Sequence, residues 1–114
     1  MVTVSVKLSE LYSAELKLHN ITVDEYKALG IEKLIVDIEK NAVCCSRTSM
    51  EPVAYELLEG CHRSKALLEL GYSGEVTLQY TGPDDTDTAP ILLKDVPIVE
   101  DAEYEEYRIE YDLL

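Results

Sequence analysis

The sequence lacks tryptophan and phenylalanine, and it has only two histidines and ten basic residues against 23 acidic ones. No secretory-type apolar region is visible near the first residue, and no apolar run approaches the roughly 20 residues of a membrane span. The three cysteines, Cys44, Cys45 and Cys61, form an odd set, which does not suit a disulfide framework. We therefore expect a cytoplasmic protein with reduced thiols and no membrane partner.

Few residues are available for metal or nucleophilic chemistry. Cys44, Cys45, Cys61 and His62 provide three thiols and an imidazole, but zinc sites usually space their cysteines two to four residues apart. Adjacent cysteines on a strand point to opposite faces, so we expect no metal and no cofactor. A Cys/His metal protein remains an alternative interpretation.

Known catalytic and ligand motifs are missing as well. Residues 84–87 resemble the start of a calcium loop, but Ala89 and Pro90 stand where a ligand and a glycine are needed. No phosphate-binding glycine loop and no hydrolase motif occurs in the sequence. We expect a protein that is not an enzyme.

The chain length and composition predict one folded domain spanning residues 1–114. With 46% hydrophobic and 29% charged residues, the chain lies outside the disordered class, which combines low hydrophobicity with high charge. At 114 residues it buries enough surface to fold without disulfides or metal.

Alternating apolar and polar residues predict most of the sheet. Residues 2–8 and 12–18 show this period and predict an antiparallel hairpin. Further strands are expected over residues 34–39, 43–47 and 76–80.

Two helices are predicted from capping patterns. Thr22 and Glu25 form a capping box, which starts a short helix over residues 23–29 that Gly30 ends. A second capping box, from Thr48 to Glu51, starts another helix with Pro52 in its first turn. This helix places an apolar stripe inward, consisting of Met50, Val53, Ala54, Leu57, Leu58 and Cys61. Residues 66–70 are compatible with a strand or with a helix ended by Gly71. The fold class is α+β: an antiparallel β-sheet with one or two short helices packed on one face.

The acidic charge is concentrated near the end of the sequence. Residues 84–114 hold eleven acids and two bases, a net −9, whereas residues 1–83 hold twelve acids and eight bases, a net −4. Such a field repels nucleic acid and anionic membranes and attracts basic protein surfaces, although acidity can also serve solubility alone. Direct nucleic-acid binding is therefore disfavoured.

The segment of residues 106–113 predicts a final strand. Tyr107, Ile109, Tyr111 and Leu113 alternate with charged residues, and the helical alternative leaves two of these apolar residues on the wrong face. A strand would space the outward carboxylates by roughly 6.6 to 6.8 Å in a regular row.

The sequence has eight tyrosines and neither phenylalanine nor tryptophan. Tyrosine is enriched in interfaces, and the tyrosines among these acids could contact arginines. For Tyr107 and Tyr111 the simpler interpretation is that they fill the inner face of the last strand, whereas Tyr104 is the better candidate for a contact.

The leading functional hypothesis is a non-enzymatic inhibitor that occupies a basic, nucleic-acid-binding surface of another protein. Carboxylates can replace a phosphate track and compete for the same lysines and arginines, as in phage inhibitors of host nucleases and in immunity proteins against nuclease toxins. The alternative is an assembly module that pairs edge strands as a homo-oligomer or virion component, and the oligomeric state stays open. The predicted partner-binding residues are Asp84, Asp85, Asp87, Glu100, Asp101, Glu103, Tyr104, Glu105, Glu106, Glu110 and Asp112.

Overall fold

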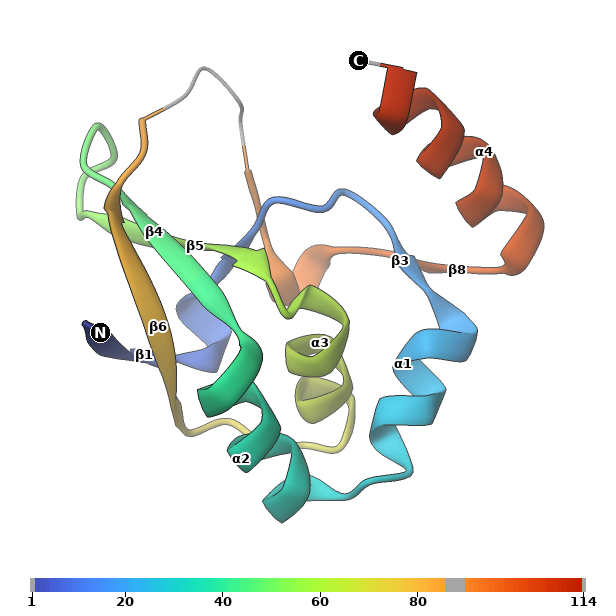
Figure 1. Cartoon of the computed structure of the whole chain (residues 1–114), viewed down its shortest axis with the longest axis horizontal. Coiled ribbons are helices and arrows are strands. Elements are labelled where there is room, and N and C mark those ends of the chain that lie inside the picture. Colours follow the sequence, from blue (N-terminus) through green and yellow to red (C-terminus); the bar gives the residue numbers. More distant parts are fainter. Residues whose placement is uncertain (1, 86–89, 114) are drawn as a thin grey trace.

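The computed structural model describes residues 2–85 and 90–113, and side chains within 2–85 and 90–108. The described chain forms a six-stranded sheet covered by helices, which confirms the predicted α+β class (Figure 1). The strand order is β1-β6-β4-β5-β2-β7. These strands are β1 (Thr3–Lys7), β2 (Tyr12–Ser13), β4 (Val43–Arg47), β5 (Ala54–Glu59), β6 (Glu75–Pro83) and β7 (Ile91–Leu92).

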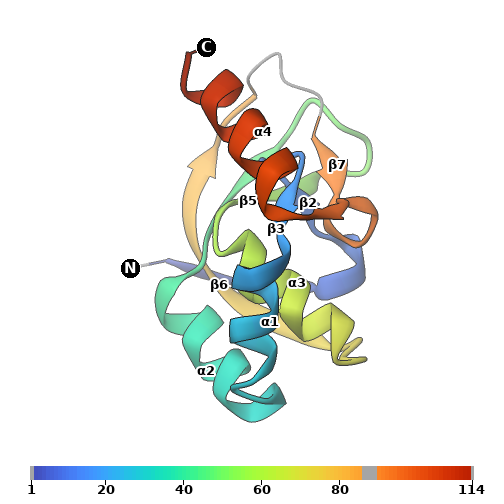
Figure 2. The ribbon, with the colours of Figure 1, turned by 90° about the vertical axis from the view of Figure 1, so that its right-hand side faces the viewer.

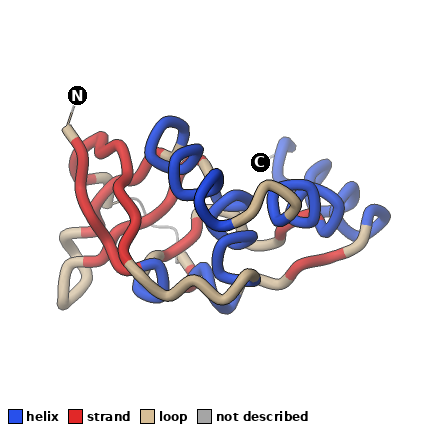
Figure 3. Tube along the Cα trace, turned by 90° about the horizontal axis from the view of Figure 1, so that it is seen from below, coloured by secondary structure: helices blue, strands red, loops and turns tan. Residues whose placement is uncertain are grey.

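Four helices and a second, two-stranded sheet complete the described structure. Viewed from below, the strands of the large sheet lie to one side of the helices (Figure 3). The helices are α1 (Asn20–Lys27), α2 (Ile31–Asn41), α3 (Cys61–Glu69) and α4 (Asp101–Leu113), with short 3-10 turns η1 (Leu8–Glu10) and η2 (Leu93–Asp95). The small sheet pairs β3 (Leu18–His19) with β8 (Ile98–Val99) in parallel. No described helix is both long enough and apolar enough to cross a membrane.

The large sheet is mixed, which corrects the expectation of a purely antiparallel sheet. β1–β6, β4–β5 and β2–β7 are antiparallel, but β4–β6 and β2–β5 are parallel. β6 runs in the same direction as β4, and the chain between them, which includes β5 and α3, provides the long crossover that a parallel pair needs.

The predicted hairpin of residues 2–8 and 12–18 is wrong, although β1 itself is a strand. β1 pairs with β6, whereas β2 pairs with β5 and β7. The turn η1 separates them because Leu8 and Leu11 are fully buried, so this segment enters the core instead of making a tight surface turn.

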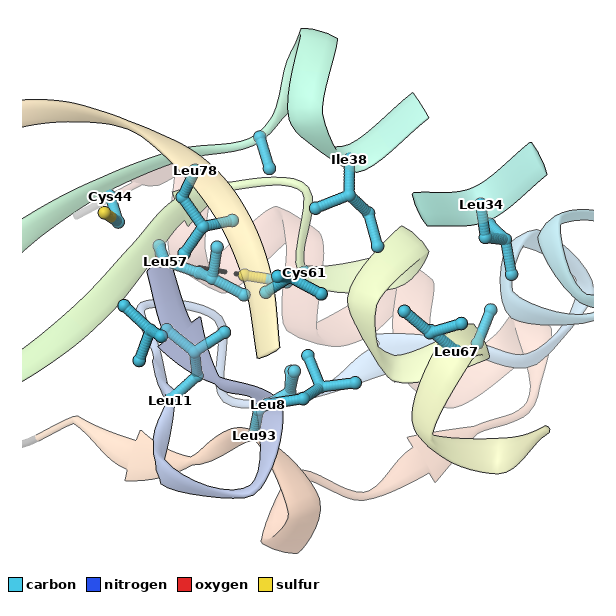
Figure 4. Close-up of a cluster of buried hydrophobic side chains, with 14 of the residues drawn as sticks. Leu8, Leu11, Leu34, Ile38, Cys44, Leu57, Cys61, Leu67, Leu78 and Leu93 are labelled. Atoms are coloured by element: carbon cyan, nitrogen blue, oxygen red, sulfur yellow. Dashed lines mark hydrogen bonds between the residues drawn. The ribbon is translucent and has the colours of Figure 1, made fainter. Parts of the chain in front are cut away.

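A single cluster of buried apolar side chains joins the sheet to the helices (Figure 4). Its fully buried large members come from η1, η2, α2, α3, the sheet and adjoining segments. They include Leu8, Leu11, Leu34, Ile38, Cys44, Leu57, Leu67, Leu78 and Leu93.

The segment predicted as a strand over residues 34–39 is the helix α2. Leu34 and Ile38 are fully buried and lie one helical turn apart, whereas Val36 is 51% exposed. A strand would have placed all three on one face, so in this short apolar segment the period of two was misleading.

The reverse error occurs after Pro52, where the predicted helix is the strand β5. Leu57 belongs to the core cluster and Tyr55 packs against it. Glu56 lies between them and points to the other face of the sheet, where Arg47 binds it. Sheet pairing with β4 and β2 therefore determines the conformation here. Residues 66–69 adopt the helical alternative as part of α3, and Leu70 is its C-cap residue.

The predicted C-terminal strand is also wrong, because residues 101–113 form α4. Figures 1 and 2 together show this helix outside both sheets, beside β3 and β8. A segment without a partner strand leaves its backbone groups unpaired, whereas a helix satisfies them internally. The alternation of residues 106–113 therefore did not determine the structure.

Candidate functional site

Most acidic residues of the C-terminal segment gather at the start of α4. Glu100 precedes the helix, and Asp101, Glu103, Glu105 and Glu106 lie in its first two turns. All five are exposed. Since Asp101 and Glu103 stand in the first turn, they also stabilise the helix through its dipole.

The helix gives these carboxylates a higher linear density than the predicted strand. The six residues from Asp101 to Glu106 hold four carboxylates and occupy about 9 Å of helix axis at the usual 1.5 Å rise per residue. That is one charge per about 2.3 Å of axis, compared with roughly 1.7 Å for duplex DNA. The carboxylates point in several directions around the axis, so α4 is a charged rod and not the single row that was predicted.

Two of the four carboxylates are already bound within the chain. Asp101 Oδ1 contacts His19 Nε2, and Glu103 Oε1 lies 3.2 Å from Lys17 Nζ. Within the described part of the chain, neither Glu105 nor Glu106 has an ion-pair partner. These two carboxylates are therefore the ones most available to another molecule.

The predicted acids of the loop after β6 form a separate group. Asp85 accepts hydrogen bonds from the hydroxyls of Thr48 and Ser49 and from the Ser49 amide, which hold the pKa of Asp85 below its usual value. The Asp84 amide donates to Ser46 O at 2.9 Å. Figures 1 and 2 show the end of β6 and α4 directed to the same end of the molecule, on separate elements.

Three predicted partner-binding residues cannot be placed as side chains. Asp87 lies outside the described residues. Glu110 and Asp112 belong to α4, but their side chains lie outside the described part. The structure thus brings six of the eleven predicted residues together at the start of α4: Glu100, Asp101, Glu103, Tyr104, Glu105 and Glu106.

Both histidines of the chain lie where α4 meets the body of the protein. The ring of Tyr104 stacks on the ring of His19, with centroids 5.0 Å apart and an interplanar angle of 22°. The ring of His62 meets Tyr104 edge-on, at 5.9 Å and 84°. We refer to His19, His62 and Tyr104 as the histidine clamp.

His62 has a defined hydrogen-bonding state within the clamp. Its Nε2 accepts a hydrogen bond of 3.0 Å from the His19 amide, and its Nδ1 faces Glu15 Oε2 at 3.5 Å. The neutral ring therefore carries its proton on Nδ1. Burial, aided by the nearby His19 and Arg63, lowers the pKa of His62 to about 4, so the ring is uncharged at neutral pH.

The groups around His62 are also shielded from water. Burial raises the pKa of Glu15, and the same cause, with the Glu15 charge as a second contribution, raises the pKa of Tyr104. His19 completes the arrangement through Nδ1, which lies 3.0 Å from the Thr22 hydroxyl. Thr22 therefore bonds to His19 and does not cap α1 as predicted, because α1 begins earlier, at Asn20.

A hollow of about 320 Å³ lies beside the clamp, at the start of α3. Arg63, on its wall, is bound elsewhere: its Nε donates to Asp37 Oδ2 at 2.9 Å, and its guanidinium lies 4.9 Å from the Tyr26 ring centroid. The lining residues are Glu15, Thr22, Tyr26, Leu58, Glu59, Gly60, Cys61, His62 and Arg63. Carboxylates and a guanidinium share this wall, so its charge does not select a ligand of one sign.

The thiols are not placed for nucleophilic chemistry. Cys61 accepts a hydrogen bond from the Ser13 hydroxyl at 3.3 Å and donates toward Leu57 O, and burial raises its pKa to about 11. Cys61 and His62 therefore make contacts in different directions. Cys44 belongs to the core cluster, whereas Cys45 faces Glu56 on the other side of the sheet. Across residues 2–85 and 90–108, no three His, Cys, Asp or Glu side chains are arranged to hold a metal ion.

The clamp was not found from the sequence, where His19 and His62 stand 43 positions apart. The one indication in the sequence was Tyr104, which lies outside the alternating pattern of Tyr107 and Tyr111 and was predicted to make a contact. Comparison of the chain with protein-family models, with curated proteins and with solved structures finds no match.

Proposed function

We propose that this protein is a small non-enzymatic binding protein that occupies a basic, nucleic-acid-binding surface of a partner protein. The observation that supports it best is the helix α4, whose first two turns carry exposed carboxylates at one charge per about 2.3 Å of axis, compared with roughly 1.7 Å for duplex DNA. Lysines and arginines that neutralise phosphates would bind these carboxylates in the same way.

The position of α4 supports the proposal further. The helix lies outside the sheets, so its acidic sides are not covered by the rest of the described chain (Figure 2). Glu105 and Glu106 have no described ion-pair partner and need not give one up on binding. The proposed inhibitor would belong to the type of phage counter-defence proteins or nuclease immunity proteins.

We place this activity in the cytoplasm, where the three buried, free thiols would stay reduced. The net charge of −13 supports a basic protein partner and disfavours direct contact with nucleic acid or an anionic membrane.

The test compares two variants in which the same number of carboxylates is neutralised, so that their net charges are equal. Glu105→Gln with Glu106→Gln removes two charges of α4, and Glu32→Gln with Glu39→Gln removes two exposed charges of α2 as a matched control. The proposal expects the α4 variant alone to lose most of its inhibition of a nucleic-acid-binding partner and to show a weaker salt dependence. A further α4 variant adds Glu110→Gln and Asp112→Asn. If both α4 variants inhibit the partner as well as the α2 variant does, the proposal is refuted.

A further inference from the structure

The described contacts of α4 with the rest of the chain converge on one short segment and on His62. The Leu16 amide donates to Tyr107 Oη at 3.2 Å, Lys17 pairs with Glu103, and His19 binds Asp101 and stacks on Tyr104. All of these partners lie within residues 16–19. The direction of α4 therefore depends on how firmly this segment is held.

His62 attaches that segment to the body of the protein through a hydrogen bond to the His19 amide. It projects from α3, whose residues Cys61 and Leu67 are buried in the core. Its Nε2 fixes the His19 amide, and its ring edge contacts Tyr104. One side chain anchored in the body thus contacts both β3 and α4.

The ion pair of α4 with Lys17 is weak by comparison. The Lys17–Glu103 pair is exposed on both sides, at 36% and 58%, and such surface pairs contribute about 0–1 kcal/mol. His19 is 21% exposed and His62 16% in their side chains, so the clamp is the better shielded part of the attachment.

We infer that His62 is a positioning residue that, through His19 and Tyr104, fixes the direction in which α4 leaves the body of the protein. This inference rests on the proposed function, because it assigns to His62 the rigid presentation of the α4 carboxylates. His62 itself touches no partner. Without it, α4 keeps its charges and loses its fixed direction.

A fixed direction affects binding in a way that differs from a loss of charge. Ordering a loosely attached helix against a rigid partner costs conformational entropy, so affinity falls by roughly three- to tenfold. The number of carboxylates is unchanged, so the slope of affinity against salt concentration stays the same. Neutralising the carboxylates lowers both affinity and slope.

The test compares His62→Ala with His62→Gln in the full-length chain. Alanine removes the ring and the acceptor for the His19 amide, whereas the glutamine amide oxygen can still accept that hydrogen bond. Leu78→Ala, which opens a cavity in the core away from α4, controls for a general loss of stability. Residual dipolar couplings of α4 amides relative to those of α2 report the direction of α4. Binding to a folded histone dimer across a salt series serves as the affinity probe.

We expect the α4 couplings to average toward zero in His62→Ala and to persist in His62→Gln and Leu78→Ala. Binding of His62→Ala to the histone dimer weakens with an unchanged salt slope. Unchanged couplings in His62→Ala, or averaged couplings without weaker binding, would overturn the inference. A failure of Glu105→Gln with Glu106→Gln to weaken histone binding would instead count against the proposed function, because the couplings test the clamp independently.

Discussion

The neutral His62 ring predicts that the protein loses stability on mild acidification. In the unfolded chain the imidazole has a pKa near 6.5, and in the folded protein the pKa is about 4. Between these values the unfolded state binds a proton that the folded state does not. The contribution of His62 to the free energy of unfolding is therefore fully present above pH 6.5 and is lost as the pH decreases toward 4.

The magnitude follows from the two pKa values. Across the whole window the loss is about 3 kcal/mol, and between pH 7 and pH 5 it is about 2 kcal/mol. Little discount for solvent screening is needed, because the His62 side chain is only 16% exposed. Glu15 acts in the opposite direction: its pKa is raised, so acidification relieves the cost of its buried charge.

The variant His62→Gln isolates the histidine contribution, because glutamine does not titrate. Urea denaturation at several pH values between 4.5 and 7.5 gives the free energy of unfolding for both proteins. We expect the wild-type protein to lose about 2 kcal/mol more than the variant between pH 7 and pH 5. Parallel pH profiles would refute the neutral, buried state of His62.

Three further predictions concern the body of the fold. Gly60→Ala places a Cβ 2.8 Å from the Ala42 Cβ at a φ of +94°, so we expect a loss of about 1–3 kcal/mol by urea denaturation. Gly71→Ala is the control, because it has a φ of +89° and nothing lies within 4 Å of the added Cβ. An equal loss of stability in both variants would show that the contact with Ala42 does not contribute. Glu56→Ala removes the carboxylate that lies 3.0 Å from the buried Arg47 guanidinium, and should cost about 3–5 kcal/mol. The double variant Arg47→Met with Glu56→Leu should recover much of this loss, and no recovery would argue against the loss of this buried ion pair as the cause. All three cysteines are buried with pKa values of about 11, so a thiol reagent at pH 8 should modify them only in denaturant; rapid native modification would contradict their burial.

The fold class was predictable because the amphipathic strands β1, β6 and β4, which lie together at one side of the large sheet, carry a clear signal. Each of them lies within or around a predicted segment. Errors arose in short apolar segments such as residues 34–39, where Leu34 and Ile38 fit a strand and a helix equally well. There the packing of α2 against the core decides between them, and local sequence does not contain that information.

The acidic surface was found from composition, but its geometry was not. Residues 106–113 alternate as a strand does, and only the absence of a neighbouring strand makes a helix favourable. The clamp depended on long-range contacts between His19, His62 and Tyr104, which no local pattern indicates. A helix bearing dense carboxylates is, however, equally suited to the function predicted for the strand.

The most direct test of the central claim is affinity capture from the native host with the wild-type protein and with the α4 variant Glu105→Gln, Glu106→Gln. We predict that the wild-type protein retains a basic nucleic-acid-binding protein that duplex DNA or RNA displaces, and that the α4 variant does not retain it. Equal capture by both proteins, or a captured partner that nucleic acid fails to displace, would contradict the account.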